Sequence, residues 1–125
     1  MRERALRIVL VAFGLIALVG VYPLMRLWPA GWRWQPYHPA YEHMITVFYA
    51  TLGLFLLIAA RRPAQHRSLI LFAGWSSLAH GAVMGIDALR MSGERGHLLG
   101  DVPALIIAGA LVLLLTARQL PSHVD

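Results

Sequence analysis

The amino-acid sequence has 125 residues, of which 58% are hydrophobic and 14% are charged. In a typical soluble protein roughly 25% of the residues are charged, and a soluble fold of this size cannot bury so much apolar surface. The composition therefore excludes an ordinary soluble domain and indicates a single integral membrane domain over residues 1–125. The absence of cysteine excludes disulfides, thiolate metal sites and cysteine catalysis.

The formal net charge is +5, and all eleven basic residues are arginine. The arginines lie between the hydrophobic runs, and no basic segment interleaved with aromatic residues occurs outside those runs. We therefore expect no nucleic-acid partner. The arginines are expected to anchor the chain at the headgroups of a lipid bilayer.

Four uncharged runs of 16 to 19 residues follow one another along the chain. A helix needs roughly 20 residues, with a range near 17–25, to cross the hydrocarbon core. Runs that are apolar on every face do not alternate as the strands of a membrane barrel do. The sequence predicts an all-α fold, an integral membrane four-helix bundle, with helices at about residues 6–27, 41–60, 67–89 and 99–118.

The arginines are distributed unequally between the two sides of this bundle. Seven lie at the chain ends or in the segment 61–67, and the two other loops hold four. Because arginine is in excess on the cytoplasmic side of membrane proteins, we predict an up-down-up-down topology with both termini in the cytoplasm. The expected location is the inner (cytoplasmic) membrane of a bacterium.

The predicted outer loop between the first two helices, residues 28–39, is rich in tryptophan, tyrosine and proline. Tryptophan and tyrosine favour the membrane–water interface, and proline stiffens the backbone. This composition is typical of an aromatic belt on the outer leaflet. It also fits a lid or a docking surface over a pocket.

Two helices carry polar residues at helical spacing in their outer halves. A turn near Ala64 makes the second and third helices a hairpin, which places Tyr49 level with His80 and Glu42 level with Asp87. Polar groups inside a membrane bundle face its interior and indicate function. We therefore predict an outer-leaflet pocket for a hydrophobic small molecule or a cofactor, lined by Glu42, Thr46, Tyr49, Ser76, His80, Met84 and Asp87.

Each of these polar groups has an alternative interpretation. His80 is a candidate axial haem ligand, metal ligand or proton carrier, or a structural histidine bonded to Tyr49, Ser76 or a backbone carbonyl. Glu42 and Asp87 form either a carboxylate pair or separate ion pairs with arginine. Beside the polar line runs a stripe of small residues that lets another helix approach closely: Ala73, Ser77, Gly81 and Gly85.

Asp101 directly precedes a valine and a proline, a pattern typical of a helix start in which the aspartate caps the helix. A metal site is an alternative, although no spacing such as H-E-x-x-H is present. The candidate metal ligands are His43, His80, His97 and Asp101.

The segment Tyr49-Ala50-Thr51-Leu52-Gly53-Leu54-Phe55-Leu56-Leu57-Ile58-Ala59-Ala60-Arg61 resembles the second helix of DoxX-like proteins, small bacterial membrane proteins with four spans. The segments 75–81 and 100–105 differ from typical members, which suggests a divergent or a separate, uncharacterised four-span family. The resemblance implies an accessory role in membrane redox chemistry near quinones or respiratory enzymes, and it assigns no residue.

Three classes of function fit these observations. The leading hypothesis is a binding or accessory protein whose pocket holds a quinone, a lipid or a haem. The alternative is a structural subunit of a larger membrane complex or a homo-oligomer, with the aromatic loop as its docking surface. An enzyme that uses Glu42, His80 and Asp87 as an acid–base set is the third, and no catalytic motif supports it.

Overall fold

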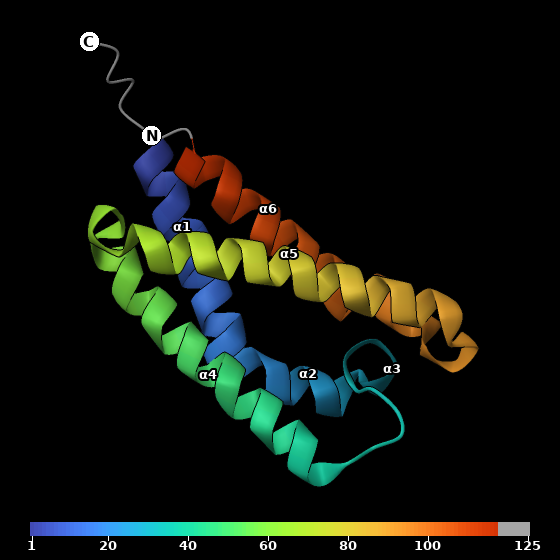
Figure 1. Ribbon diagram of the computed structural model, residues 1–125. Helices are drawn as coiled ribbons and strands as arrows, with labels where there is room; N and C mark the ends of the chain where they lie inside the picture. The colour runs from blue at the N-terminus through green and yellow to red at the C-terminus, as the bar shows by residue number, and fades with distance from the viewer. Residues whose placement is uncertain (118–125) are drawn as a thin grey trace.

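The computed structural model describes residues 1–117, and this part of the chain is helical apart from short connections (Figure 1). The last residue of the predicted fourth helix, residue 118, lies outside the described residues. In chain order the elements are α1 (Arg2–Leu15), the π-helix η1 (Ile16–Gly20), α2 (Val21–Leu27), α3 (Pro29–Trp32), α4 (Pro39–Arg61), the 3-10 helix η2 (Pro63–His66), α5 (Arg67–Arg90), the 3-10 helix η3 (Ser92–Leu99) and α6 (Asp101–Ala117).

Three helical stretches of the described chain are long and apolar enough to cross a membrane: Arg2–Leu27, Pro39–Arg61 and Pro63–Arg90. A fourth is counted if η3 and α6, which meet at an angle of 41°, form one broken span. The protein is therefore an all-helical membrane protein. The break falls at Gly100, whose backbone is not helical, so α6 begins at Asp101 and the residue 99 predicted to open this helix belongs to η3.

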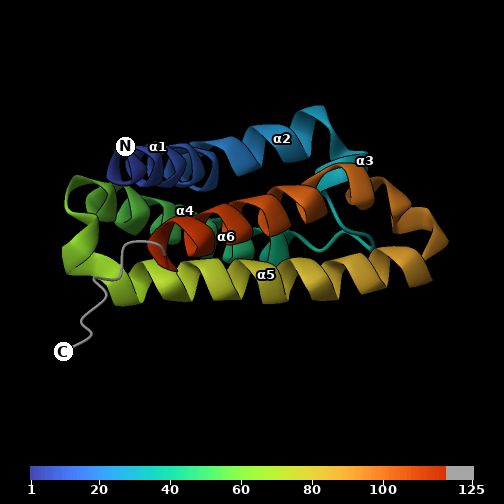
Figure 2. The same cartoon turned by 90° about the horizontal axis from the view of Figure 1, so that it is seen from above.

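The long helices pack as two pairs, α1 with α4 and α5 with α6. Figure 2 shows α6 running between α5 and the α1–α2 stretch. Glycines allow close approach in both pairs. A Cβ atom at Gly53 would lie 2.5 Å from the carbonyl oxygen of Gly14, and one at Gly109 would lie 2.8 Å from that of Gly74.

The small-residue stripe on α5 faces α6, as the sequence predicts for a helix contact. Ala73, Ser77 and Gly81 are buried. A Cβ atom at Gly81 would lie 2.8 Å from the side chain of Ile106. The stripe is therefore occupied within the chain and is not open to another subunit.

The apolar core lies near η2 and the N-terminal end of the chain, where all four long helices meet. Its fully buried members include Leu6, Leu10, Leu56, Ile70 and Val112. From η2, α4 and α5 run apart (Figure 1). At the opposite end the two halves are joined again, because α3 packs on η3.

Candidate ligand-binding pocket

A cavity of about 620 Å³ lies between the two helix pairs, with walls from α1, η1, α2, α4, α5 and α6. Binding pockets for small organic molecules have volumes of roughly 300–1,000 Å³, so the cavity has the size of a ligand site. Most of its lining is apolar. The polar side chains and indole rings that line it are Trp32, Trp34, Tyr49, His80, Asp87 and Asp101.

The lining changes character along the bundle. Towards the apolar core it consists of apolar side chains, among them Val9, Phe13 and Leu111. The carboxylates of Asp87 and Asp101 line the opposite end. Since α6 rises about 1.5 Å per residue, Leu111 lies roughly 15 Å along the axis from Asp101. The cavity therefore suits an elongated molecule with one polar and one apolar end.

A hydrogen bond between Tyr49 and His80 crosses the gap between α4 and α5. The Tyr49 hydroxyl lies 2.5 Å from Nδ1 of His80, and the two rings are stacked with centroids 5.8 Å apart. This confirms the predicted level pairing of the two residues. Within residues 1–117 the Nε2 atom of His80 has no hydrogen-bond partner, so it remains available to a ligand.

A buried polar cluster supports the opposite wall of the cavity. The carboxylate of Asp101 lies 2.8 Å from Nδ1 of His97 and accepts a hydrogen bond of 3.0 Å from the indole nitrogen of Trp34. Trp34 stacks on the imidazole at a centroid distance of 4.0 Å. On the other side of the ring, a Glu94 oxygen lies 3.0 Å from Nε2, out of line for a good hydrogen bond.

This cluster is buried, with Glu94 at 6%, His97 at 1% and Asp101 at 6% exposure. The carboxylates of Asp101 and Glu94 lie beside the two ring nitrogens of His97. These contacts hold the imidazole in place, and the ring separates the two carboxylates. The cluster thus presents one oriented carboxylate to the polar end of the cavity.

The structure brings together four of the seven residues predicted to bind a ligand. Tyr49, His80, Met84 and Asp87 all line the cavity. The hydroxyl of Thr46 donates to the carbonyl of Glu42, and that of Ser76 donates to the carbonyl of Ala73. Neither residue lines the cavity, and each hydroxyl is satisfied on the preceding turn, as is usual for a helical serine or threonine.

Glu42 lies outside this cavity and is paired with Arg33. An Oε2–Nε distance of 2.8 Å and an Oε1–Nη2 distance of 2.9 Å join the two side chains. They line a smaller cavity of about 250 Å³ under the aromatic loop. Of the two alternatives predicted for Glu42, the ion pair with an arginine forms and the carboxylate pair with Asp87 does not. The acid–base set with His80 is not assembled.

The candidate metal ligands do not converge. Among residues 1–117 no three histidine, aspartate or glutamate side chains are placed to hold a metal ion. His43 is exposed on α4, and both ring nitrogens of His97 already face carboxylates. Asp101 starts α6, as its sequence pattern predicts, but its carboxylate is bound to side chains from two other segments.

The predicted site residues did not include Glu94, Trp32 and Trp34, although the lid alternative for the aromatic loop, residues 28–39, covers the two tryptophans. The spacing of Glu94, His97 and Asp101 places the three on one helical face, and that signal was available. The contact of Trp34 with Asp101 spans 67 residues of sequence, so no local pattern could reveal it. Trp32 lines the cavity with a buried indole N–H that has no hydrogen-bond partner among residues 1–117.

The fold and the cavity define an all-helical membrane protein with a pocket between two helix pairs. The chain belongs to a family of unknown function (DUF6632), whose model matches residues 2–123. No curated protein and no solved structure matches it. A separate, uncharacterised family agrees with the sequence analysis, whereas none of the comparisons supports the DoxX-like resemblance.

Proposed function

We propose that this protein binds a hydrophobic small molecule in the membrane, with the polar end of the ligand between the Tyr49–His80 pair and Asp101. The carrying observation is the cavity of about 620 Å³, which is apolar at one end and polar at the other. Ligand sites combine apolar walls with a few oriented polar groups in this way. The protein would act as a binding or accessory protein.

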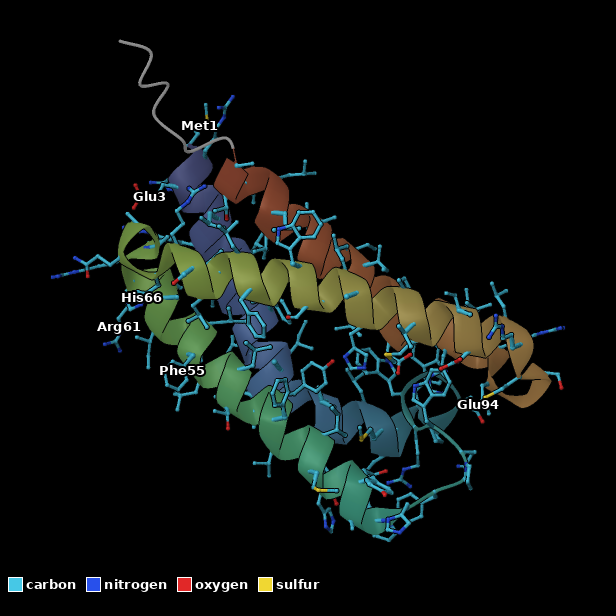
Figure 3. The ribbon with its side chains drawn as sticks, viewed as in Figure 1. Met1, Glu3, Phe55, Arg61, His66 and Glu94 are labelled. Carbon is cyan, nitrogen blue, oxygen red and sulfur yellow. The ribbon has the colours of Figure 1, made fainter. Side chains whose placement is uncertain are left out.

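We propose that the protein lies in a bacterial inner membrane with a defined orientation. The four spans run up-down-up-down with both termini in the cytoplasm, so that the polar end of the pocket faces the outer leaflet. Figure 3 places Glu3, Arg61 and His66 towards one end of the molecule and Glu94 towards the other. The arginine-rich end is the cytoplasmic one by the positive-inside rule.

The candidate ligands of this pocket are quinones, lipids and haem. A quinone carbonyl or a lipid hydroxyl would hydrogen-bond to Nε2 of His80. If the ligand is a haem, Nε2 of His80 is the atom that would hold its iron, since Nδ1 is already engaged by Tyr49. Visible absorption separates haem from the other two, and the mass of the released molecule separates a quinone from a lipid.

The test is native mass spectrometry of the full-length protein from mild detergent, with a visible absorption spectrum of the same sample. We expect a bound molecule in the wild type and an about tenfold loss of retention in His80→Ala, the loss that roughly 1.4 kcal/mol produces. His43→Ala is the control, because it removes an exposed histidine outside the cavity. Equal retention in both folded variants would show that the pocket assignment is wrong.

A role as a subunit of a larger complex or a homo-oligomer is the second candidate. The observation in its favour is the exposure of aromatic side chains in and after the outer loop, with Trp28 at 43%, Tyr37 at 46% and Tyr41 at 67%. Gentle purification that returns the protein only with a partner, and without a ligand, would favour this role.

A further inference from the structure

The charged groups that line the cavity are all acidic. Asp87 of α5 and Asp101 of α6 contribute carboxylates, His80 contributes an imidazole, and no arginine among residues 1–117 belongs to the lining. Behind Asp101, a single imidazole, that of His97, is shared between the carboxylates of Asp101 and Glu94. The three carboxylates of Asp87, Asp101 and Glu94 outnumber the two imidazoles of His80 and His97. The net charge of this end is therefore negative even when both imidazoles are protonated, and it is more negative when His80 is neutral.

Of the carboxylates of Asp87, Asp101 and Glu94, that of Asp87 has no positive group beside it in residues 1–117. Among residues 1–117 its carboxylate has no ion-pair or hydrogen-bond partner, whereas Asp101, Glu94 and Glu42 each have one. It lies on a membrane-spanning helix, where an unpaired carboxylate is costly. A positive group on the ligand would remove that cost.

Aromatic rings surround the same end of the cavity. Trp32, Trp34 and Tyr49 belong to its lining together with the two carboxylates. Aromatic rings combined with carboxylates form the usual binding site for alkylammonium groups, because the ring quadrupole attracts a cation that is weakly hydrated. The apolar end, with Val9 and Leu111, accepts an alkyl or ring-bearing tail.

We infer that the pocket takes lipophilic cations: molecules with an aliphatic or aromatic body and an ammonium head group, which lies between Asp87 and Asp101. This inference rests on the proposed function and specifies its ligand class. It disfavours fatty acids and anionic phospholipids, whose head groups would meet carboxylates without an arginine.

The experiment uses the full-length protein in nanodiscs of phosphatidylcholine, whose zero net charge avoids enrichment of cations at the bilayer surface. Three photoactivatable probes share one diazirine-bearing alkyl chain and end in trimethylammonium, hydroxyl or carboxylate. After irradiation, peptide mapping measures labelling of the cavity walls on α1 and α6. We expect the ammonium probe to label them about tenfold more than the carboxylate probe, as an aromatic and carboxylate site implies.

Asp87→Asn tests the assigned carboxylate, and Glu3→Gln is the matched control, since it removes the same charge at an exposed position paired with Arg7. We expect Asp87→Asn to reduce the ammonium preference to about twofold and Glu3→Gln to leave it unchanged. Equal labelling by all three probes, a preference for carboxylate, or an unchanged preference in Asp87→Asn would overturn the head-group assignment while the pocket stands. Absence of labelling on the cavity walls by any probe would overturn the pocket itself.

Discussion

The two ends of this molecule are built on different principles. Near η2 the helices meet through aliphatic side chains and glycines, with Leu10, Leu56 and Ile70 fully buried. Away from η2, α4 and α5 lie apart, and polar contacts join the halves: the Tyr49–His80 bond near the middle of the two helices and the buried cluster around His97 at the opposite end. Close packing needs no polar groups, whereas a cavity requires that helices be held at a distance.

This difference explains where the buried charge lies. In lipid, apolar surface gives little drive for helix association, so small residues and hydrogen bonds supply it. The core end uses small residues, and the cavity ends against its apolar side chains. The pocket end uses oriented hydrogen bonds across longer distances, and these same groups then face the cavity. At the pocket end, therefore, the same polar residues both stabilise the fold and line the binding site, whereas at the core end they do not.

We expect the largest loss of stability from a substitution that removes the buried polar contacts at the pocket end. Asp101→Ala leaves His97 and the indole N–H of Trp34 buried without their partner, so we expect a loss of about 3–5 kcal/mol in the free energy of unfolding. Titration with denaturing detergent, followed by far-ultraviolet circular dichroism, measures it. Asp87→Ala is the control and should not lower the value, because the Asp87 carboxylate has no partner to lose and its removal relieves the cost of an unpaired charge on a membrane helix. Similar losses for both variants would contradict the view that the cluster supports this end.

A smaller effect is expected from disturbing the close packing of α1 and α4. A methyl group at position 53 would lie 2.5 Å from the carbonyl oxygen of Gly14 and 2.6 Å from the backbone nitrogen of Leu18. Backbone atoms cannot turn away as a side chain can, so Gly53→Ala should cost about 1–3 kcal/mol in the same titration. Gly93→Ala places its methyl group in open space and serves as the control. A tolerated Gly53→Ala would mean that α1 and α4 are not held at this distance.

The smallest effect concerns the exposed charge at the core end. The 2.6 Å contact between Glu3 and Arg7 joins two side chains with 60% and 49% exposure. Water screens such a pair, so Glu3→Gln should lower the free energy of unfolding by less than about 0.5 kcal/mol. A loss approaching that of Asp101→Ala would remove the contrast between the two ends.

The sequence predicted what depends on periodicity. Hydrophobic runs located the membrane helices, and the hairpin register placed Tyr49 opposite His80 because two helices joined by a short turn fix each other's level. The small-residue stripe on α5 likewise identified a helix contact, which α6 makes. These features are local, so spacing along one or two helices was sufficient.

The remaining features depend on contacts between distant segments. Glu42 was assigned to the pocket by its helical face, but Arg33 in the preceding loop pairs with it and turns it to another cavity. The loop geometry that brings Trp34 to Asp101 has no periodic signal. The helix start at Asp101 was predicted from the residues that follow it, but the predicted helical range 99–118 ran across Gly100, where the 3-10 helix η3 ends. Loops therefore decided which polar residues reach the cavity.

The π-helix η1 changes the direction in which the side chains of α2 point relative to those of α1. In η1 the backbone N–H of Val21 bonds to the carbonyl of Ile16, five residues back, so this turn holds one residue more than an α-turn. Leu6 and Met25 are 19 residues apart, and a regular helix at about 100° per residue would leave them roughly 100° out of phase. The extra residue cancels that offset. One inserted residue thus keeps the buried faces of α1 and α2 on the same side of the span, and deleting it would rotate one of these faces into lipid.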